Sequence, residues 1–266
     1  MAFDGEFLIT GGADRTVKVH RNTISPGPGP QRLGECLHTW KGHTERVIGV
    51  VRPEGTRQVV SAAPDAKLIF WDLDTGEKIR ELELPAPILC LGAAEGYLAV
   101  GMMNGNVSVF TDKTGEEVLT WQAYQRAAVR SIYFPSQTRI MTGGGNGVVR
   151  FWDLKEGGTP DGGFYTIEGR GIAHEYKGHN APVVALQGDE VKIVSAASDG
   201  VVRVFDMKMG EELFRIEGHS DDIRSLQFDR RFLITDGTMN TIVVHDFASE
   251  EGSDEFEIEG FELEDE

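Results

Sequence analysis

The chain has 266 residues, of which 40% are hydrophobic, and it contains 33 glycines and two cysteines. This length suffices for one sizeable core, and no apolar run approaches the roughly 20 residues that a membrane-spanning helix requires. Cys36 and Cys90 are too few for a disulfide framework or a four-cysteine metal site. Because the amino terminus lacks the features of a secretory signal, we expect a cytoplasmic or nuclear protein, unless an upstream extension carries a targeting signal.

The formal net charge of −17 is distributed unevenly. Residues 249–266 contain 10 acidic side chains and no basic ones, which leaves −7 on the rest of the chain. Such a chain would repel nucleic-acid phosphates, so we expect no direct nucleic-acid binding. The acidic tail, residues 248–266, is either a solvated extension or a segment that docks on a basic partner.

Three residue positions recur six times at one strict spacing. A Ser, Thr or small residue is followed four positions later by a turn position, mostly Asp or Asn, and six positions after that by an aromatic position. The triplets are Thr10, Asp14 and His20; Ser61, Asp65 and Trp71; Val100, Asn104 and Phe110; Thr142, Asn146 and Trp152; Ser195, Asp199 and Phe205; and Thr235, Met239 and His245. Successive triplets lie about 40 residues apart, which indicates a repeat array in one domain spanning residues 1–247.

The first repeat is incomplete. When it is aligned with the last repeat, Phe3 matches Phe228 and Thr10 matches Thr235. Most of the preceding strand would then fall before Met1, so either the first unit lacks that strand or the natural chain continues upstream.

Residues 22–35 follow and include a Pro-Gly-rich stretch, which we expect to be an extended loop.

Residues 42–83 show the content of one repeat. Apolar or alternating runs predict strands at 47–51, 58–62, 67–71 and 78–83. Turn-forming residues separate these runs, and no part of the body shows a sustained helical period. Each repeat is therefore predicted to be a four-stranded antiparallel meander in an all-β protein.

The repeats resemble the WD-repeat β-propeller family. Gly-His pairs end at His43, His179 and His219, and Trp-Asp pairs begin at Trp71 and Trp152. The resemblance covers residues 1 to about 247 and implies six recognisable four-stranded blades, the first incomplete, with repeats ending near residues 20, 71, 110, 152, 205 and 245. The array could also be part of a larger propeller.

A buried hydrogen-bond network explains the repeated spacing. We expect His to bond the turn Asp, a hydroxyl to join the His, and an indole to complete the network. The residues assigned to it are His43, Ser61, Asp65, Trp71, His179, Ser195, Asp199, His219 and Thr235. His43, Ser61 and Asp65 have the residue types of a nucleophilic triad, but a buried and mutually satisfied set is not suited to catalysis. We therefore expect no catalytic residues, no cofactor and no metal site.

Arginines supply candidate partner-binding residues. Arg130 and Arg224 occupy one register in the predicted inner strands, where other repeats have Ile48 and Val184, and Arg46 lies near the start of another inner strand. In F-box-type WD-repeat substrate receptors, arginines in this register bind phosphorylated peptides, so the resemblance implies an anionic ligand. The alternative is that these arginines pair with local acids such as Asp222 or Glu45.

Two further segments are candidate interaction elements. Residues 155–174 form a Gly-rich insertion with Phe164 and Tyr165, which is either a partner-binding loop or a mobile surface loop. Residues 255–261 alternate acidic and apolar side chains and could supply the outer strand of the last blade, with Phe256, Ile258 and Phe261 buried. The alternative for this tail is disorder.

Together these features predict a non-catalytic protein–protein interaction scaffold or adaptor subunit of a larger complex. Its partners would be other proteins, bound at the channel mouth and loops. The alternative function is a phosphopeptide-binding substrate receptor of a ubiquitin ligase, which would need an F-box or similar segment that these residues do not contain. A propeller enzyme would need titratable groups clustered at the channel mouth, and the sequence shows no such cluster.

Overall fold

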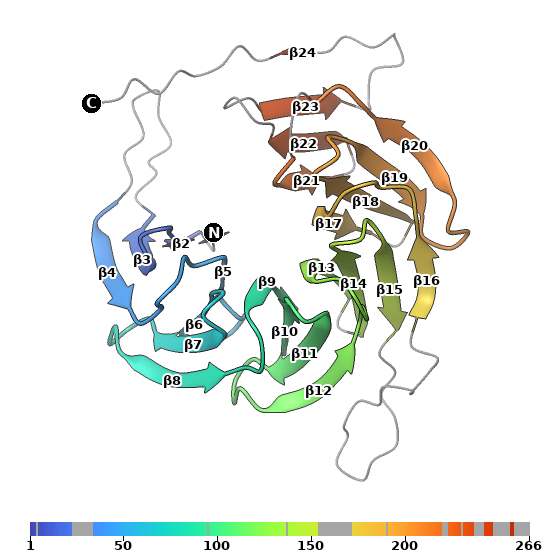
Figure 1. Ribbon diagram of the computed structural model, residues 1–266. Helices are drawn as coiled ribbons and strands as arrows, with labels where there is room; N and C mark the ends of the chain where they lie inside the picture. Colours follow the sequence, from blue (N-terminus) through green and yellow to red (C-terminus); the bar gives the residue numbers. More distant parts are fainter. Residues whose placement is uncertain are drawn as a thin grey trace. The chain divides into compact units, whose positions relative to one another are not determined.

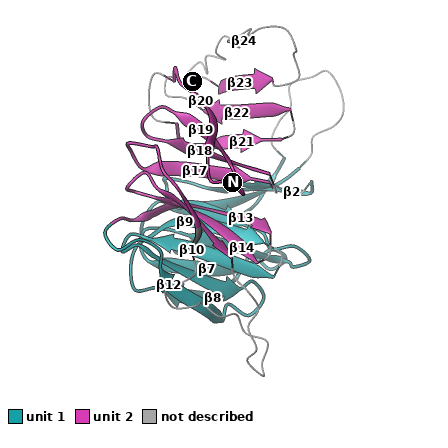
Figure 2. Ribbon diagram, turned by 90° about the vertical axis from the view of Figure 1, so that its right-hand side faces the viewer, with its two compact units in different colours: residues 1–126 teal, residues 127–266 magenta. Residues whose placement is uncertain are grey.

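The computed structural model describes residues 1–3, 5–22, 34–94, 96–136, 138–153, 172–189, 191–219, 223–229, 231–236, 242–246 and 256–257. The described residues form strands and turns, and none of their segments is a helix long and apolar enough to cross a membrane. Six four-stranded antiparallel sheets follow one another along the chain (Figure 1). They fall into two compact units, residues 1–126 and residues 127–266 (Figure 2).

The first unit contains the first, second and third sheets, in which neighbouring strands are also consecutive in sequence. The strands of the first sheet are β1 (Ala2–Phe3), β2 (Phe7–Gly11), β3 (Thr16–Arg21) and β4 (Cys36–Lys41); those of the second are β5 (Gly49–Val51), β6 (Gln58–Ala62), β7 (Lys67–Asp72) and β8 (Lys78–Glu83); those of the third are β9 (Ile88–Ala94), β10 (Tyr97–Met102), β11 (Asn106–Thr111) and β12 (Glu117–Gln122).

The second unit contains the fourth, fifth and sixth sheets, which have the same order. The strands of the fourth sheet are β13 (Val129–Ser136), β14 (Arg139–Gly144), β15 (Val149–Asp153) and β16 (Ile172–Tyr176); those of the fifth are β17 (Val183–Gly188), β18 (Lys192–Ala197), β19 (Val202–Asp206) and β20 (Glu212–Ile216); those of the sixth are β21 (Leu226–Phe228), β22 (Phe232–Asp236), β23 (Ile242–Asp246) and β24 (Phe256–Glu257).

The predicted meander is confirmed, with one boundary corrected. In the second sheet the inner strand begins at Gly49 rather than at residue 47. The amide of Val47 instead donates to the carbonyl of Gly12 in the neighbouring sheet, so this residue joins two sheets before the strand pairs with β6. The first sheet has an inner strand of only two residues, Ala2–Phe3.

Apolar faces of successive sheets pack together within each unit. In the first unit, Phe7, Ile9 and Val19 of the first sheet join Val59 and Trp71 of the second in one buried cluster. The opposite face of the second sheet packs on the third in the same way. In the second unit, equivalent clusters join the fourth sheet to the fifth and the fifth to the sixth. This burial of both faces explains why the middle strands read as continuous apolar runs.

The turn between the second and third strands needs a left-handed residue directly after its Asp or Asn. Five repeats show a positive φ at this position: Arg15 (66°), Ala66 (64°), Gly105 (86°), Gly147 (78°) and Gly200 (72°). Glycine adopts this conformation without a steric penalty, whereas Arg15 and Ala66 are strained by their Cβ atoms. At Gly147 a Cβ would also lie 2.3 Å from the carbonyl oxygen of His179.

Replacing Ala66 with glycine should therefore stabilise the protein. The relief of left-handed strain is partly offset by the greater freedom of glycine in the unfolded chain, so we expect a net gain of about 0.5–1 kcal/mol. The measurement is the urea midpoint of unfolding at unchanged slope. Gly147→Ala makes the reverse change at the equivalent position of another repeat and serves as the control, so it should lower the midpoint. A fall in the midpoint for Ala66→Gly would contradict the strain argument.

Candidate functional site

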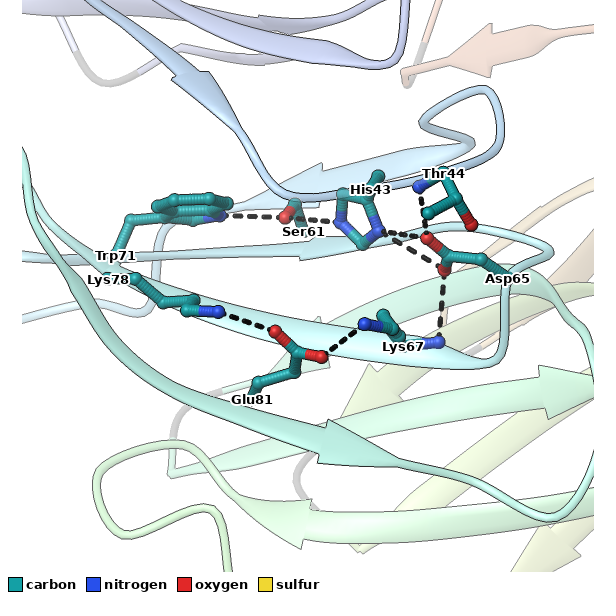
Figure 3. Close-up of polar contacts among 8 residues, drawn as sticks. All are labelled: His43, Thr44, Ser61, Asp65, Lys67, Trp71, Lys78 and Glu81. Atoms are coloured by element: carbon teal, nitrogen blue, oxygen red, sulfur yellow. Dashed lines mark hydrogen bonds and ion pairs between the residues drawn. The ribbon is translucent and has the colours of Figure 1, made fainter.

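The second sheet holds four polar side chains in one chain of hydrogen bonds (Figure 3). The indole Nε1 of Trp71 donates to Ser61 Oγ over 2.8 Å, and His43 Nε2 lies 2.8 Å from the same hydroxyl. His43 Nδ1 lies 3.1 Å from Asp65 Oδ2. Ser61 is opposite Ile69 in the ladder, so Trp71 stands diagonally across from it on the same face. The structure thus brings together all four residues that the sequence assigned to this repeat.

Asp65 also holds the turn backbone. Its Oδ2 accepts the amide N–H of Thr44 over 2.8 Å, and its Oδ1 accepts the amide N–H of Lys67 over 3.1 Å. The Lys67 side chain forms an ion pair with Glu81 of β8, which also binds Lys78 (Figure 3). The carboxylate therefore links the segment that enters β5 to the turn that enters β7.

The hydrogen-bond directions indicate a neutral His43. An indole can only donate, and a serine hydroxyl has one proton, so Ser61 donates to His43 Nε2 while Nδ1–H of His43 donates to Asp65. Burial lowers the pKa of His43 from its ordinary value, and the nearby Asp65 opposes this shift. Because Ser61 is fully buried, the set holds a turn rather than presenting a nucleophile to a substrate.

The fifth sheet repeats the arrangement without the indole. His179 Nε2 lies 2.8 Å from Ser195 Oγ, and its Nδ1 lies 3.1 Å from Asp199 Oδ2. Asp199 accepts the amide N–H groups of Asn180 and Val201, as Asp65 does for its own turn. Phe205 stands where the second sheet has Trp71, so Ser195 receives no indole hydrogen bond.

The sixth sheet keeps less of the network. His219 Nε2 lies 2.8 Å from Thr235 Oγ1, so these two residues also come together. By sequence spacing the carboxylate position is Met239, which lies outside the described residues. The aromatic position is His245, whose ring centroid lies 6.4 Å from that of His219.

Two contacts involve residues outside the set that the sequence assigned to the network. Trp152 Nε1 donates to Thr142 Oγ1 over 2.9 Å, although the fourth repeat has no Gly-His pair. Asp236 accepts the amide N–H groups of Arg224 and Ser225 and so holds the entry to β21. The spacing of Thr142 and Trp152 signals the first contact, whereas the second depends on proximity between strands that the sequence pattern does not encode.

Stacked rings reinforce the contact between the first and second sheets. Trp40 of β4 stacks on Trp71 with centroids 5.3 Å apart and an interplanar angle of 2°. His38 also stacks on Trp40, with ring centroids 5.6 Å apart, and its Nε2 lies 3.0 Å from the carbonyl oxygen of Leu73. The Ser61 network is thus continued by ring contacts into the neighbouring sheet.

Arg130 and Arg224 share one structural register in the second unit. Each lies two residues before a residue that pairs with the repeat's Thr: Ile132 with Thr142, and Leu226 with Thr235. Both arginines are exposed, and within the described part of the chain neither forms an ion pair. Asp222, one of the acids considered as a partner, lies outside the described residues.

Arg46 belongs to the first unit and is also exposed, directly before Val47. It makes no ion pair with Glu45 or with any other described residue. The remaining candidates, Phe164 and Tyr165, lie outside the described residues. No group of three or more His, Cys, Asp or Glu side chains arranged to hold a metal occurs in the described ranges.

Removing the Ser61 hydroxyl should be more damaging than removing that of Ser195. Ser61→Ala leaves two buried groups unsatisfied, Trp71 Nε1 and His43 Nε2, and should cost about 2–5 kcal/mol of unfolding free energy. Ser195→Ala leaves only His179 Nε2 and should cost about 1–3 kcal/mol. Urea unfolding of both variants gives the comparison, and equal losses would show that the indole contributes nothing to the network.

Comparison with known proteins agrees with this geometry. The family described as "WD domain, G-beta repeat" matches residues 1–21, 34–72, 115–153 and 171–206, together just over half of the chain. The chain is 27% identical over 210 residues to the guanine nucleotide-binding protein subunit beta of Oryza sativa subsp. japonica, covering 73% of this chain and 53% of the relative. It is 29% identical over 157 residues to the DENN domain and WD repeat-containing protein SCD1 of Arabidopsis thaliana, covering 55% of this chain and 12% of that protein.

A solved structure shows the same fold. The computationally designed Ika8 protein superposes with a TM-score of 0.72 at 23% identity, covering 97% of this chain and 74% of the designed one. The chain spans about half the length of the beta-subunit relative from rice. With six four-stranded sheets, the repeated His–Asp–hydroxyl network and the family match in place, the chain belongs to the WD-repeat family, and its sheets are the blades of a WD-repeat β-propeller.

Proposed function

We propose that this chain is a non-catalytic interaction scaffold that serves as an adaptor subunit of a multiprotein complex. The observation that carries this proposal is how its polar residues are used. The His, Ser and Asp side chains that could perform chemistry are engaged in turn-holding networks, whereas Arg46, Arg130 and Arg224 are exposed at the entries to inner strands. Because the sheets are already ordered before a partner binds, less conformational entropy is lost when the interface forms.

The relatives support the same class of role. The rice and maize relatives are described as beta subunits of a guanine nucleotide-binding protein, which makes each of them a component of an assembly. The sequence identity is 27%, and the match covers about half of each relative. We therefore infer for this chain only the general role of a subunit, and not membership of the same complex.

The exposed arginines are the partner-binding residues of this proposal. Arg130→Glu and Arg224→Glu, combined with Arg46→Glu, should weaken capture of at least one partner about tenfold or more, because reversed charges at an interface repel the groups that they formerly attracted. The measurement is affinity capture from native extract with quantitative mass spectrometry.

The matched control for this variant is Arg139→Glu. Arg139 is exposed and lies at the opposite end of the fourth sheet, where β14 begins and pairs with Ser136. Its replacement should leave the captured set unchanged. If the triple variant retains every partner at the wild-type level while keeping its urea midpoint, these arginines are not the binding residues.

A second candidate function is phosphopeptide recognition by a ubiquitin-ligase substrate receptor. It is favoured by two exposed guanidinium groups in one register without a described acid partner, since arginine suits phosphate by its paired donors. It is weakened at the position directly before the turn Asp or Asn, where the resemblance to such receptors implies a further arginine and where this chain has none. The residues at this position are Ala13, Pro64, Met103, Gly145, Ser198 and Thr238.

Phosphatase treatment separates the two functions. A substrate receptor should lose its captured phosphoproteins when the extract is dephosphorylated and should retain ligase subunits. A structural subunit should keep one stoichiometric set of partners before and after treatment, and that result would exclude the receptor function.

A further inference from the structure

The sixth sheet differs from the second and fifth in the surroundings of its histidine, His219, which is half-buried. His43 and His179 each have a carboxylate oxygen 3.1 Å from Nδ1. His219 makes the same Nε2 contact with a hydroxyl, to Thr235, but its Nδ1 is shielded from solvent and has no carboxylate oxygen bonded to it within the described residues. A second imidazole, His245 of β23, lies beside it with ring centroids 6.4 Å apart.

From this juxtaposition we infer that the sixth sheet is a proton-sensitive element, which loosens from the fifth sheet on mild acidification while the second sheet remains closed. Protonation would place an imidazolium in a half-buried site next to another imidazole and without a bonded carboxylate among the described residues. Desolvating a charge under these conditions is costly, so the proton is accepted chiefly when the sheet opens. This inference concerns regulation and is independent of the proposed partner-binding role.

Few groups surround His219 in the part of the chain that the structure describes. His245 faces it from β23, Thr235 bonds it from β22, the carboxylate of Asp236 lies at the end of β22, and the backbone of Gly200 approaches from the turn of the fifth sheet. Asp221 and Asp222 follow it in sequence and lie outside the described residues. Asp236 is engaged with the amides of Arg224 and Ser225 rather than with the imidazole.

Burial lowers the pKa of His219 below its ordinary value of 6.5, and the neighbouring His245 lowers it further, while a hydrogen bond with the backbone of Gly200 and the charge of Asp236 oppose the shift. Burial also lowers the pKa of His43 and of His179, but in both cases the adjacent aspartate is the next largest influence and opposes it. Because the folded-state pKa is depressed, the stability linked to His219 is fully present above pH 6.5 and is lost as the pH falls below that value.

The position of His219 couples this titration to the packing of two sheets. Ile223 and Leu233 of the sixth repeat are buried against Val194, Val202 and Val204 of the fifth sheet. Gly200, whose backbone approaches His219, lies in the turn between the two strands that carry those valines. Opening at His219 would therefore expose the apolar face of the fifth sheet.

Hydrogen exchange of the full 266-residue chain at pH 7.5 and pH 5.5, corrected for the intrinsic pH dependence of exchange, tests the inference. One imidazole of ordinary pKa 6.5 that is protonated only in the opened state should lower protection about tenfold at pH 5.5. We expect this loss in peptides covering 232–236 and 242–246, with a smaller change in 58–62 and 67–72. An equal change in both sheets, or none in the sixth, would overturn the inference.

Two variants identify the responsible group. His219→Gln removes the imidazole of His219 and can still bond Thr235, so the loss of protection in the sixth sheet at pH 5.5 should fall well below tenfold even if its absolute level of protection is lower. Met239→Asp places a carboxylate at the spacing that Asp65 and Asp199 occupy after Ser61 and Ser195, and it should reduce the loss at pH 5.5 toward that of the second sheet. If His219→Gln prevents the sheet from ordering at pH 7.5, Met239→Asp decides: an undiminished tenfold loss in that variant would contradict the inference.

Discussion

The geometry of the second blade depends on one group, the hydroxyl of Ser61. It has one proton and two lone pairs, so it can receive the indole N–H of Trp71 and donate to His43 at the same time. That donation fixes the tautomer of His43, which in turn directs Nδ1–H at Asp65 and leaves the carboxylate oxygens to accept two backbone amides. One buried hydroxyl therefore orders a turn, a strand entry and an aromatic ring, and through the Trp40–Trp71 stack it reaches the neighbouring blade.

The other blades show how much of this network can be lost when packing replaces it. In the fifth blade Phe205 takes the place of the indole and packs with the ring of Tyr176 at 5.4 Å, while the phenol hydroxyl donates to the carbonyl of Met207. Burial, with a smaller contribution from Asp206, raises the pKa of Tyr176 to about 12. In the third blade the hydroxyl position is Val100, which is fully buried in an apolar cluster with Leu98. Hydrogen bonds fix the orientations of the side chains that they join, whereas apolar contacts stabilise the sheet without fixing those orientations. Blades that lack the network therefore keep the sheet, but their turns and side chains are less strictly oriented.

The sequence predicted those features that depend on spacing along one hairpin. A separation of ten residues between Ser61 and Trp71 places them diagonally across β6 and β7, and the same separation applies to Thr142 and Trp152, so strands and network residues could be assigned from the pattern. Contacts between neighbouring blades could not be assigned in this way. Gln187 of β17 bonds both backbone groups of Phe228 in the next blade, and Val47 leaves its predicted strand to bond Gly12, because both contacts depend on how sheets approach one another. The left-handed conformation of Arg15 and Ala66 could not be predicted from the sequence either, since neither residue is the glycine that usually marks such a turn.

These differences between blades bear on how such a scaffold can act. Local stability follows buried contacts and satisfied polar groups, so a blade with a complete network should open less often than one whose histidine lacks a carboxylate. In this chain the complete network lies in the second blade and a reduced one in the sixth, while Arg130 and Arg224 stand at the inner strands of the fourth and sixth blades. A partner that contacts Arg224 would thus bind at a blade with a reduced network, and part of its binding energy would hold that blade closed. Partner binding at Arg224 and the stability set by His219 would then be linked through the sixth blade, although different residues carry them, so a rigid fold could respond to its surroundings without a separate regulatory domain.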